Sequence, residues 1–500
     1  MKKIYLTFIV LALVFVSCDM DKLPEGTISD TEAYQTVDDC EALRNGLYAY
    51  MRSITTGNFV ILSDIQLDDF HAVRGNGNRL MDFYNGDFKS STDEIRGVYS
   101  GFYSVIASTN YVIEGAGELL ANGNLTDDDC MRLNRYIGEA HFIRAFCYNG
   151  LADKFCESYK NAADVDADAS GLSLQTKYAP TGDNTTYPGR STLRQTYALI
   201  TRDLEIADSL ISLYEEHTQT VPMRMSAYIT SDVAKAMQAR VYLNMGENAK
   251  AASLAESLIA TERYPLTPRN AYKNLWTNDE GSEVLWRVEM DINHQGSATG
   301  RSFASATANP DYIPTNTTIY LFDLNDVRWD VFFGDKTLEY SNEEVTVSRF
   351  AKYPGNPLLY TSSSNYSNMS KPFRSAELYL IAAEANFGVS EDKANFYLST
   401  LQSTRIIGHR GIALTGDELL AEIYNERHRE YIGEGFRFTD LKRWNLGFKR
   451  SEVQEGSDNF IYTLNNGLEY ESDDYRFLWP IPKDELDSNP QIKDQQNPGY

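Results

Sequence analysis

Residues 234–255 read AKAMQARVYLNMGENAKAASLA, and this stretch decides the fold. Alanines recur three and four positions apart on both sides of Gly246, which places small side chains along one face of each of two helices. Small side chains allow two antiparallel helices to approach closely, and a glycine suits the turn between them. The stretch therefore predicts a tightly packed helix pair.

A second helix pair is indicated further along the chain. Small and apolar residues recur with the same spacing from Ala376 to Ala385, a turn is expected near Gly388, and a following helix should run from Glu391 to Ile406. Such pairs are typical of tetratricopeptide-like repeats. One repeat cannot bury its apolar face alone, so several must stack.

Amphipathic helices earlier in the chain supply the other members of the stack. Apolar residues lie three and four apart, often behind an Asp, Ser or Thr that can cap the first turn, over residues 30–52, 93–120, 127–155 and 191–215. We therefore predict a mainly α protein. Its tetratricopeptide-type helix-pair scaffold spans about residues 30–265 and 372–450, with long irregular loop insertions and few short strands.

The amino-acid composition changes between the helical segments. Residues 266–371 are rich in Asn, Thr, Ser, Pro, Tyr and Trp and contain one strand-like run, Val284 to Met290. Residues 451–500 are similar. Because long loops in a compact protein are usually functional, we expect 266–371 to be a loop-rich ligand-binding insertion and 451–500 an irregular C-terminal segment of one body, residues 30–500.

The N-terminus carries an export and anchoring signal. Lys2 and Lys3 precede an apolar run from Ile4 to Val16, which is too short to span a bilayer, and Ser17 is the small residue before Cys18. This order predicts a lipoprotein signal peptide over residues 1–17 and lipidation of Cys18. Residues 18–29, broken by proline and glycine, should form a flexible tether on the lipid anchor.

Net charge excludes one class of partner. The chain carries a formal net charge of -25, and phosphate binding requires a basic surface, so nucleic acid is not expected as a partner. Four cysteines follow the lipidation site, and none forms a CxxC or Cys/His cluster. In an oxidising compartment they could form disulfides or remain isolated buried thiols: Cys40, Cys130, Cys147 and Cys156.

The sequence contains no motif that indicates catalysis. A Walker-type phosphate loop, HExxH and a GxSxG nucleophile elbow are missing, and the six histidines are scattered. Asp68 and Asp69 form an acidic pair, but a glycosidase needs two carboxylates at a set separation in space, which spacing in sequence does not define. We therefore favour a binding protein over an enzyme, with no catalytic residues, cofactor or metal site.

Tyrosine is abundant, with 33 Tyr and 5 Trp in the chain. An aromatic face can stack on a sugar ring while Asn, Asp and Arg side chains bond its hydroxyls, so loops that mix these residues can bind glycans. Four tryptophans lie beside apolar motifs and are expected in the core: Trp276, Trp286, Trp444 and Trp479. Trp329 fits a buried position and a ligand-binding surface equally well. Four tyrosines in polar loops are candidate platforms for stacking on a sugar: Tyr312, Tyr320, Tyr360 and Tyr366.

Several motifs taken together resemble one family. They include GEAHFIRA from Gly138, RSAELYLIAAEA from Arg374, ERHRE from Glu426 leading to EGFRFTDLKRW from Glu434, and the ending with WPIP from Trp479 and QNPGY to the terminus. Along nearly its whole length the chain resembles the SusD/RagB-like outer-membrane nutrient-binding lipoproteins. The resemblance implies a surface-exposed, lipid-anchored protein of the outer membrane that lids a TonB-dependent SusC-like transporter and captures glycans for import.

The resemblance assigns roles only in part. Its charged motif residues look like ion pairs that fix the helix stack: Arg144, Glu377, Glu384, Glu426, Arg427, Glu430, Arg437, Asp440 and Arg443. Ligand residues in such proteins lie on variable loops. We therefore expect the ligand site to include residues of the first long loop, Asp68, Asp69, Arg79 and Tyr84, and of the second insertion, Tyr312, Trp329 and Tyr366.

Three functions fit this sequence. The first is a non-catalytic glycan-capturing lid on a transporter, which the loops rich in Tyr and Asn favour. The second is the same lid holding peptides. The third is a structural adaptor whose loops bind only protein.

Overall fold

The structure is a computed structural model and describes residues 33–75, 77, 79–305, 308–360, 363–411, 413–463 and 467–500. Within these residues helices dominate, and the strands form four antiparallel pairs. The helices are α2 Val37–Ile54, α3 Asn58–Gln66, α4 Met81–Asn85, α5 Asp93–Asn122, α6 Asp127–Phe155, α7 Leu193–Thr218, α8 Ser231–Met245, α9 Asn248–Ala260, α10 Tyr272–Thr277, α11 Asn316–Tyr320, α12 Val327–Phe332, α13 Ser375–Asn386, α14 Glu391–Arg405, α15 Gly416–Tyr431, α16 Arg437–Trp444 and α17 Lys483–Ser488. The strands are β1 Phe70–Ala72, β2 Val284–Trp286, β3 Tyr312–Pro314, β4 Phe333–Tyr340, β5 Glu343–Phe350, β6 Phe373–Arg374, β7 Phe448–Lys449 and β8 Glu469–Tyr470.

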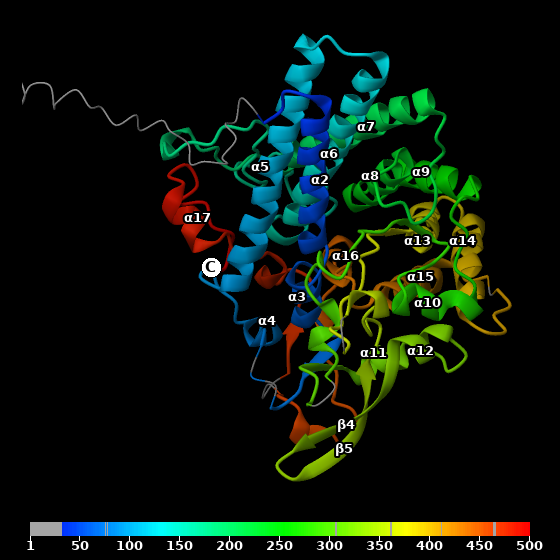
Figure 1. Cartoon of the computed structure of the whole chain (residues 1–500). Coiled ribbons are helices and arrows are strands. Elements are labelled where there is room, and N and C mark those ends of the chain that lie inside the picture. Colours follow the sequence, from blue (N-terminus) through cyan, green and yellow to red (C-terminus); the bar gives the residue numbers. More distant parts are fainter. Residues whose placement is uncertain are drawn as a thin grey trace, which may run out of the picture.

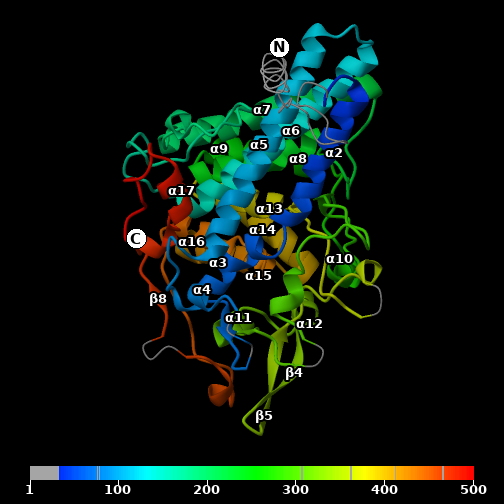
Figure 2. The same ribbon diagram turned by 60° about the vertical axis from the view of Figure 1, so that its left-hand side comes forward.

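Neighbouring helices form one continuous stack. Each helix in the series α2, α5, α6, α7, α8, α9, α13, α14 and α15 packs against the next (Figure 1). Figures 1 and 2 both show α7 to α9 lying above α13 to α15. The hairpin β4–β5 projects from the end of the molecule opposite the connection between α5 and α6. This arrangement confirms the mainly α, helix-pair scaffold.

The helix pair predicted from residues 234–255 is formed by α8 and α9. Gly246 ends α8 in the left-handed region, with φ of 78°, where only glycine avoids a steric penalty. Ala234, Ala239, Ala251 and Ala255 are fully buried, so the alanine faces are in the interior. Close packing of small side chains is therefore the reason that this stretch forms a helix pair.

Most predicted helix boundaries agree with the structure. α6 covers the predicted 127–155, and α14 ends one residue before the predicted end. α2 begins at Val37, later than the predicted start at 30, because Thr36 caps it in a reciprocal hydrogen-bond pair with Asp39. The N-cap at Thr36, and not Asp30, therefore sets the start of α2.

The insertion is more regular than predicted. Besides β2, residues 266–371 contain α10, α11, α12 and the hairpin β4–β5, whose eight-residue strands pair along their whole length. The two turn residues, Ser341 and Asn342, both have positive φ, of 53° and 64°. A two-residue turn of this kind usually contains glycine. Because Ser341 and Asn342 are not glycine, the hairpin could not be recognised from the sequence.

The aromatic core contains the tryptophans that were expected there. Trp276, Trp286 and Trp479 are at most 1% exposed, and Trp444 is also buried. Trp479 packs against Phe83, Phe155 and other rings between the helices. The four predictions of buried tryptophan are confirmed.

The charged motif residues form buried ion pairs between helices, as predicted. Arg443 on α16 pairs with Glu384 on α13, Arg427 on α15 pairs with Asp440 on α16, and Glu377 on α13 pairs with Arg240 on α8. Arg144 on α6 contacts Asp203 on α7 through two nitrogens, each 2.7 Å from a carboxylate oxygen. Because these groups are withdrawn from water, each depends on its partner for solvation.

Replacing Arg144 with alanine should therefore destabilise the scaffold. We expect a loss of about 3 kcal/mol in the free energy of unfolding, the lower end of the range for a broken buried pair, because His141 still contacts Asp203 at 2.7 Å. The exposed pair of Arg194 and Asp166 offers a control, since solvent screens it and Arg194→Ala should cost far less stability than Arg144→Ala. Denaturant unfolding of both variants measures the difference. Equal losses would contradict the scaffold role.

Several predictions concern the N-terminus and the cysteines. Residues 1–17, the tether at 18–29 and the lipidation site Cys18 lie outside the described residues. No helix among the described residues has the length and apolar character needed to cross a membrane. The four described cysteines, Cys40, Cys130, Cys147 and Cys156, are all unpaired, which corresponds to the isolated-thiol alternative.

Candidate ligand-binding surface

The structure brings together the two segments in which ligand residues were predicted. β1 pairs with β3 in antiparallel register, so that Ala72 lies opposite Tyr312, and the amide of Val73 donates to the carbonyl of Asp311 at 2.9 Å. Residues 68–84 and 311–314 are therefore neighbours although more than two hundred residues separate them in the chain. This end of the molecule also carries the β4–β5 hairpin (Figures 1 and 2).

Four of the predicted ligand residues are buried, which corrects their expected role as surface contacts. Asp69 is fully buried and its Oδ1 lies 2.6 Å from Nε2 of His428, while Asp68 pairs with Arg437 at 3.1 Å. Burial raises the pKa of Asp68, but Arg437 and His428 outweigh it and the net shift is downward, so the carboxylate stays ionised. These aspartates hold α15 and α16 against the first loop.

Tyr84 and Tyr312 are likewise structural. The hydroxyl of Tyr84 donates to the carbonyl of Tyr462, and that of Tyr312 to the carbonyl of Arg79, both at 2.6 Å. Tyr312 is 0% exposed and Tyr84 is 2% exposed, so neither ring face is open to a sugar. Tyr312 lies on a buried strand and not on the polar loop that its neighbours in sequence suggested.

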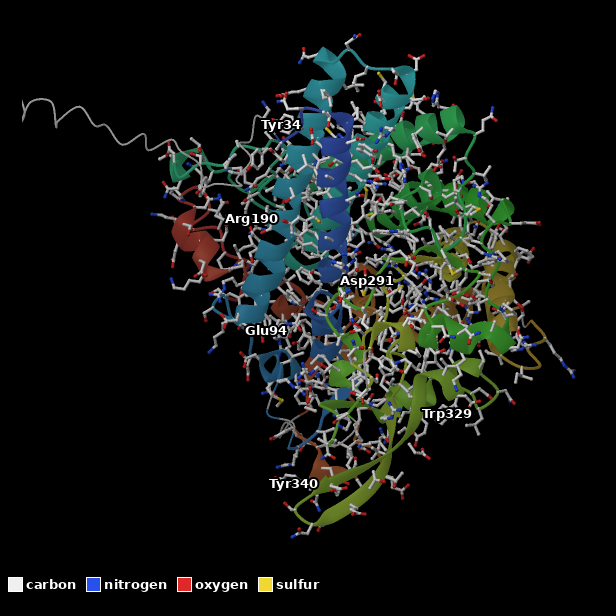
Figure 3. All side chains as sticks on the ribbon, in the orientation of Figure 1. Tyr34, Glu94, Arg190, Asp291, Trp329 and Tyr340 are labelled. Atoms are coloured by element: carbon white, nitrogen blue, oxygen red, sulfur yellow. The ribbon has the colours of Figure 1, made fainter. Side chains whose placement is uncertain are left out.

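The other three predicted residues keep accessible surface. The side chain of Arg79 is 50% exposed and lies 2.6 Å from Asp311. Trp329 on α12 is half-buried, with its ring centroid 5.4 Å from that of Phe333, and Tyr366 is half-buried in a loop with φ of 57°. Figure 3 shows Trp329 on a different part of the insertion from the hairpin tip. These residues do not form one cluster.

A partly exposed cluster that was not predicted from the sequence lies at the tip of this end. We call Arg74, Asn309, Tyr340 and Tyr462 the loop-end surface. The guanidinium carbon of Arg74 lies 5.2 Å from the ring centroid of Tyr462 and 6.0 Å from that of Tyr340, whose side chain is labelled in Figure 3. Tyr340 is 37% exposed. Two aromatic rings and a cation therefore meet at a partly exposed surface.

Backbone contacts fix the positions of these side chains. The amide and guanidinium Nε of Arg74 donate to the carbonyls of Phe460 and Ile461, at 2.7 and 3.1 Å. Asn309 is bonded to the edge of the hairpin, accepting from the amide of Glu339 at 3.0 Å and donating to its carbonyl at 2.9 Å. Three separate segments and the hairpin are thus locked together beneath the surface.

A polar pocket of about 650 Å³ adjoins this surface through the segment around Tyr462. Its walls carry hydrogen-bonding groups and three exposed carboxylates: His71, Tyr84, Asn316, Gln454, Thr463, Glu452, Glu455 and Asp458. Burial, together with the nearby guanidinium of Arg450, lowers the pKa of His71 to about 4, so its ring is neutral near neutral pH. The pocket therefore offers neutral donors and acceptors beside acidic groups.

Arg450 supports the pocket from below. It is buried, and its guanidinium donates to the carbonyls of Leu67, Ile65 and Tyr84 at 2.7 to 3.0 Å. Its guanidinium therefore binds the backbone at the end of α3 and in α4. We assign it to holding the pocket floor, not to binding a ligand.

Rings beside a guanidinium, an amide and a polar hollow are the groups that bind sugar rings and their hydroxyls. In the part of the chain that the structure describes, no group of three or more His, Cys, Asp or Glu side chains could hold a metal ion. The loop-end surface could not be found from the sequence, because nothing links positions 74, 309, 340 and 462 before the chain is folded.

Comparison with known proteins places the fold. A family model described as "Starch-binding associating with outer membrane" matches residues 24–243, and one described as "SusD family" matches residues 333–500. SusD-like protein P2 of Formosa agariphila is 26% identical over 557 residues, covering 100% of both chains. SusD-like protein P38 of the same organism is 24% identical over 560 residues, covering 100% of this chain and 99% of that protein.

Solved structures of SusD superfamily proteins have the same fold as this chain. A SusD superfamily protein from Bacteroides thetaiotaomicron matches with a TM-score of 0.78 and 27% identity, covering 93% of this chain and 100% of that one. A protein from Bacteroides vulgatus described as a putative sugar binding protein matches with a TM-score of 0.75 and 24% identity, over 94% and 99% of the two chains. The chain belongs to the SusD-like family, as its motifs predicted.

Proposed function

We propose that this protein captures glycans at the cell surface without cleaving them and passes them to a TonB-dependent SusC-like transporter in the outer membrane. The observation that carries the proposal is the loop-end surface, where the rings of Tyr340 and Tyr462 flank Arg74 beside a polar pocket. A sugar ring could stack on the tyrosines while Asn309 and the pocket bond its hydroxyls. Membership of a family associated with starch binding and the outer membrane supports this ligand class.

Three of the residues chosen from the sequence stay in the proposal. Arg79, Trp329 and Tyr366 keep exposed surface on the same insertion or loop. We assign them to outlying contacts with a long ligand, whereas Asp68, Asp69, Tyr84 and Tyr312 position the backbone.

The proposal is tested by presenting the purified chain to an array of oligosaccharides and, in parallel, to a peptide library. Saturable binding to a set of related glycans, with no peptide selected, is the expected result. The selected oligosaccharide should also keep its chain length after incubation with the protein. Selection of peptides alone would favour the peptide-binding lid, and no binding to either would favour the adaptor that binds only protein.

Anchoring is proposed to depend on the lipid at Cys18. Cys18→Ala should move the protein from the membrane fraction to the soluble fraction, because several acyl chains hold a protein durably on a membrane and a polar tether alone does not. Fractionation and labelling with a fatty-acid analogue measure the change. Cys40→Ala is the control and should remain in the membrane fraction. A Cys18→Ala variant that is labelled as strongly as wild type would contradict the anchor.

A further inference from the structure

A second cavity, partly open to solvent, lies where the helix stack meets the insertion. It has a volume of about 160 Å³ and lies between α5, α6, α8, the start of α3 and α16. No residue that lines it also lines the pocket beside the loop-end surface. Aromatic side chains form much of its wall: Phe59, Phe102, Phe146, Trp276, Tyr353 and Phe436. The cavity is therefore separate from the proposed glycan site.

One cation in this cavity, the ammonium of Lys154, has no ion pair or hydrogen bond within the part of the chain that the structure describes. Four basic residues line it, and within the described residues three of them form ion pairs: Arg240 with Glu377, Lys371 with Asp279 and Arg427 with Asp440. Lys154 is 8% exposed, and no described residue forms an ion pair or hydrogen bond with its ammonium group. Its ammonium nitrogen lies 5.7 Å from the ring centroid of Trp479, which does not line the cavity, and the neighbouring Asp153 does line it.

The surroundings make an unpaired ammonium costly. Burial lowers the pKa of Lys154, against the opposing influence of Asp153 and Asp64, which raise it. Two further lining residues, Asn149 and Trp276, each have a buried polar side-chain atom, Oδ1 and Nε1, without a hydrogen-bond partner among the described residues. Buried polar groups in folded proteins are normally satisfied, so this cavity has capacity for a polar ligand.

Cavity size and wall chemistry limit what could bind. An engineered apolar cavity of about 150 Å³ is large enough for benzene, so this one has room for a single ring or a branched chain with a small head group. The aromatic wall suits an apolar body, and the ammonium of Lys154 suits a negatively charged head group. We propose that this cavity binds a small monocarboxylate, with its carboxylate on Lys154 and its apolar body against the aromatic wall.

The test titrates the purified full chain with acetate, isovalerate, benzoate and phenylacetate, using calorimetry and thermal melting. Benzyl alcohol serves as the uncharged counterpart of benzoate. At least one of the larger carboxylates should bind with one-to-one stoichiometry, about tenfold or more tightly than benzyl alcohol. Failure of all four carboxylates to bind at millimolar concentration would overturn the proposal, as would equal binding of benzyl alcohol and benzoate.

Variants locate the binding. Lys154→Met removes the ammonium group and keeps nearly the same side-chain length. This variant should fold and melt at a higher temperature, and its affinity for the carboxylate should be at least about tenfold lower than that of wild type. Lys160→Met, at an exposed lysine nearby in sequence, should bind like wild type. Thr439→Phe fills the cavity from α16 and should block binding independently of charge. Unchanged affinity in Lys154→Met and Thr439→Phe would place the carboxylate elsewhere and overturn the assignment.

Discussion

Replacing Glu430 with glutamine is expected to lower the free energy of unfolding by about 5 kcal/mol, the upper end of the range for breaking a buried ion pair. Three arginines surround this carboxylate: Nε of Arg405 and Nη1 of Arg328 each lie 3.0 Å away, and Nη1 of Arg374 lies 2.5 Å away. All four side chains are 0% exposed. The change breaks three buried ion pairs at once and leaves the arginines with their remaining carboxylates: Asp326, Glu426, Glu283 and Glu434.

Denaturant unfolding at neutral pH measures the loss. Glu469→Gln is the matched control, because Glu469 is exposed and contacts Lys449 at 3.4 Å, and it should shift stability by less than about 1 kcal/mol. A Glu430→Gln variant as stable as this control would contradict the account of the scaffold.

The contribution of Glu430 to stability depends on pH. Burial raises the pKa of Glu430, but Arg405, Arg374 and Arg328 outweigh it and hold the pKa well below its usual value of 4.5. Because the folded pKa is depressed, the carboxylate contributes stability above the unfolded pKa and loses that contribution as pH falls through the folded pKa. The stability difference between wild type and Glu430→Gln should therefore be constant near neutral pH and shrink in strong acid.

Removing both rings of the loop-end surface should weaken glycan binding about 30-fold or more. Stacking of a base on an aromatic side chain, the nearest analogue, is worth about 1–3 kcal/mol per contact, so two contacts amount to at least about 2 kcal/mol. The variant is Tyr340→Ala combined with Tyr462→Ala. Tyr340 is 37% exposed at the hairpin tip, so its loss should cost little stability.

Calorimetric titration with the oligosaccharide selected on the array measures this effect. Tyr50→Ala is the control, because Tyr50 is 45% exposed on α2, in the helix stack, and its loss should leave affinity unchanged. Melting curves show whether the double variant remains folded. A folded double variant with wild-type affinity would exclude the tyrosines as the sugar platform.

Helices were predictable from sequence because each carries its own signals. α6 has a capping threonine, three aspartates in its first turn and apolar residues at helical spacing, and its predicted bounds agree with the structure. Motif residues such as Glu426 and Glu430 were also assigned correctly to the scaffold, from the family resemblance, and both pair with Arg328 in the interior. Local pattern and charge pairing are thus sufficient to define most of the stack.

The ligand surface was less predictable, because exposure is not a local property. Tyr312 lies in a polar stretch of sequence, but pairing of β1 with β3 buries it, whereas Tyr340 is exposed because a hairpin without a glycine turn carries it outward. Arg74 and Tyr462 become neighbours only through backbone hydrogen bonds between distant segments. The first long loop does lie beside this surface, but three of the four residues chosen on it, Asp68, Asp69 and Tyr84, are buried.

The most direct test of the central claim is a crystal structure of the full chain with the oligosaccharide that the array selects. The account predicts a sugar ring stacked on Tyr340 or Tyr462, with hydroxyls bonded to Arg74, Asn309 or the adjoining polar pocket. An oligosaccharide bound only at a site that contacts none of these residues, such as the surface around Trp329 and Tyr366 alone, would contradict it.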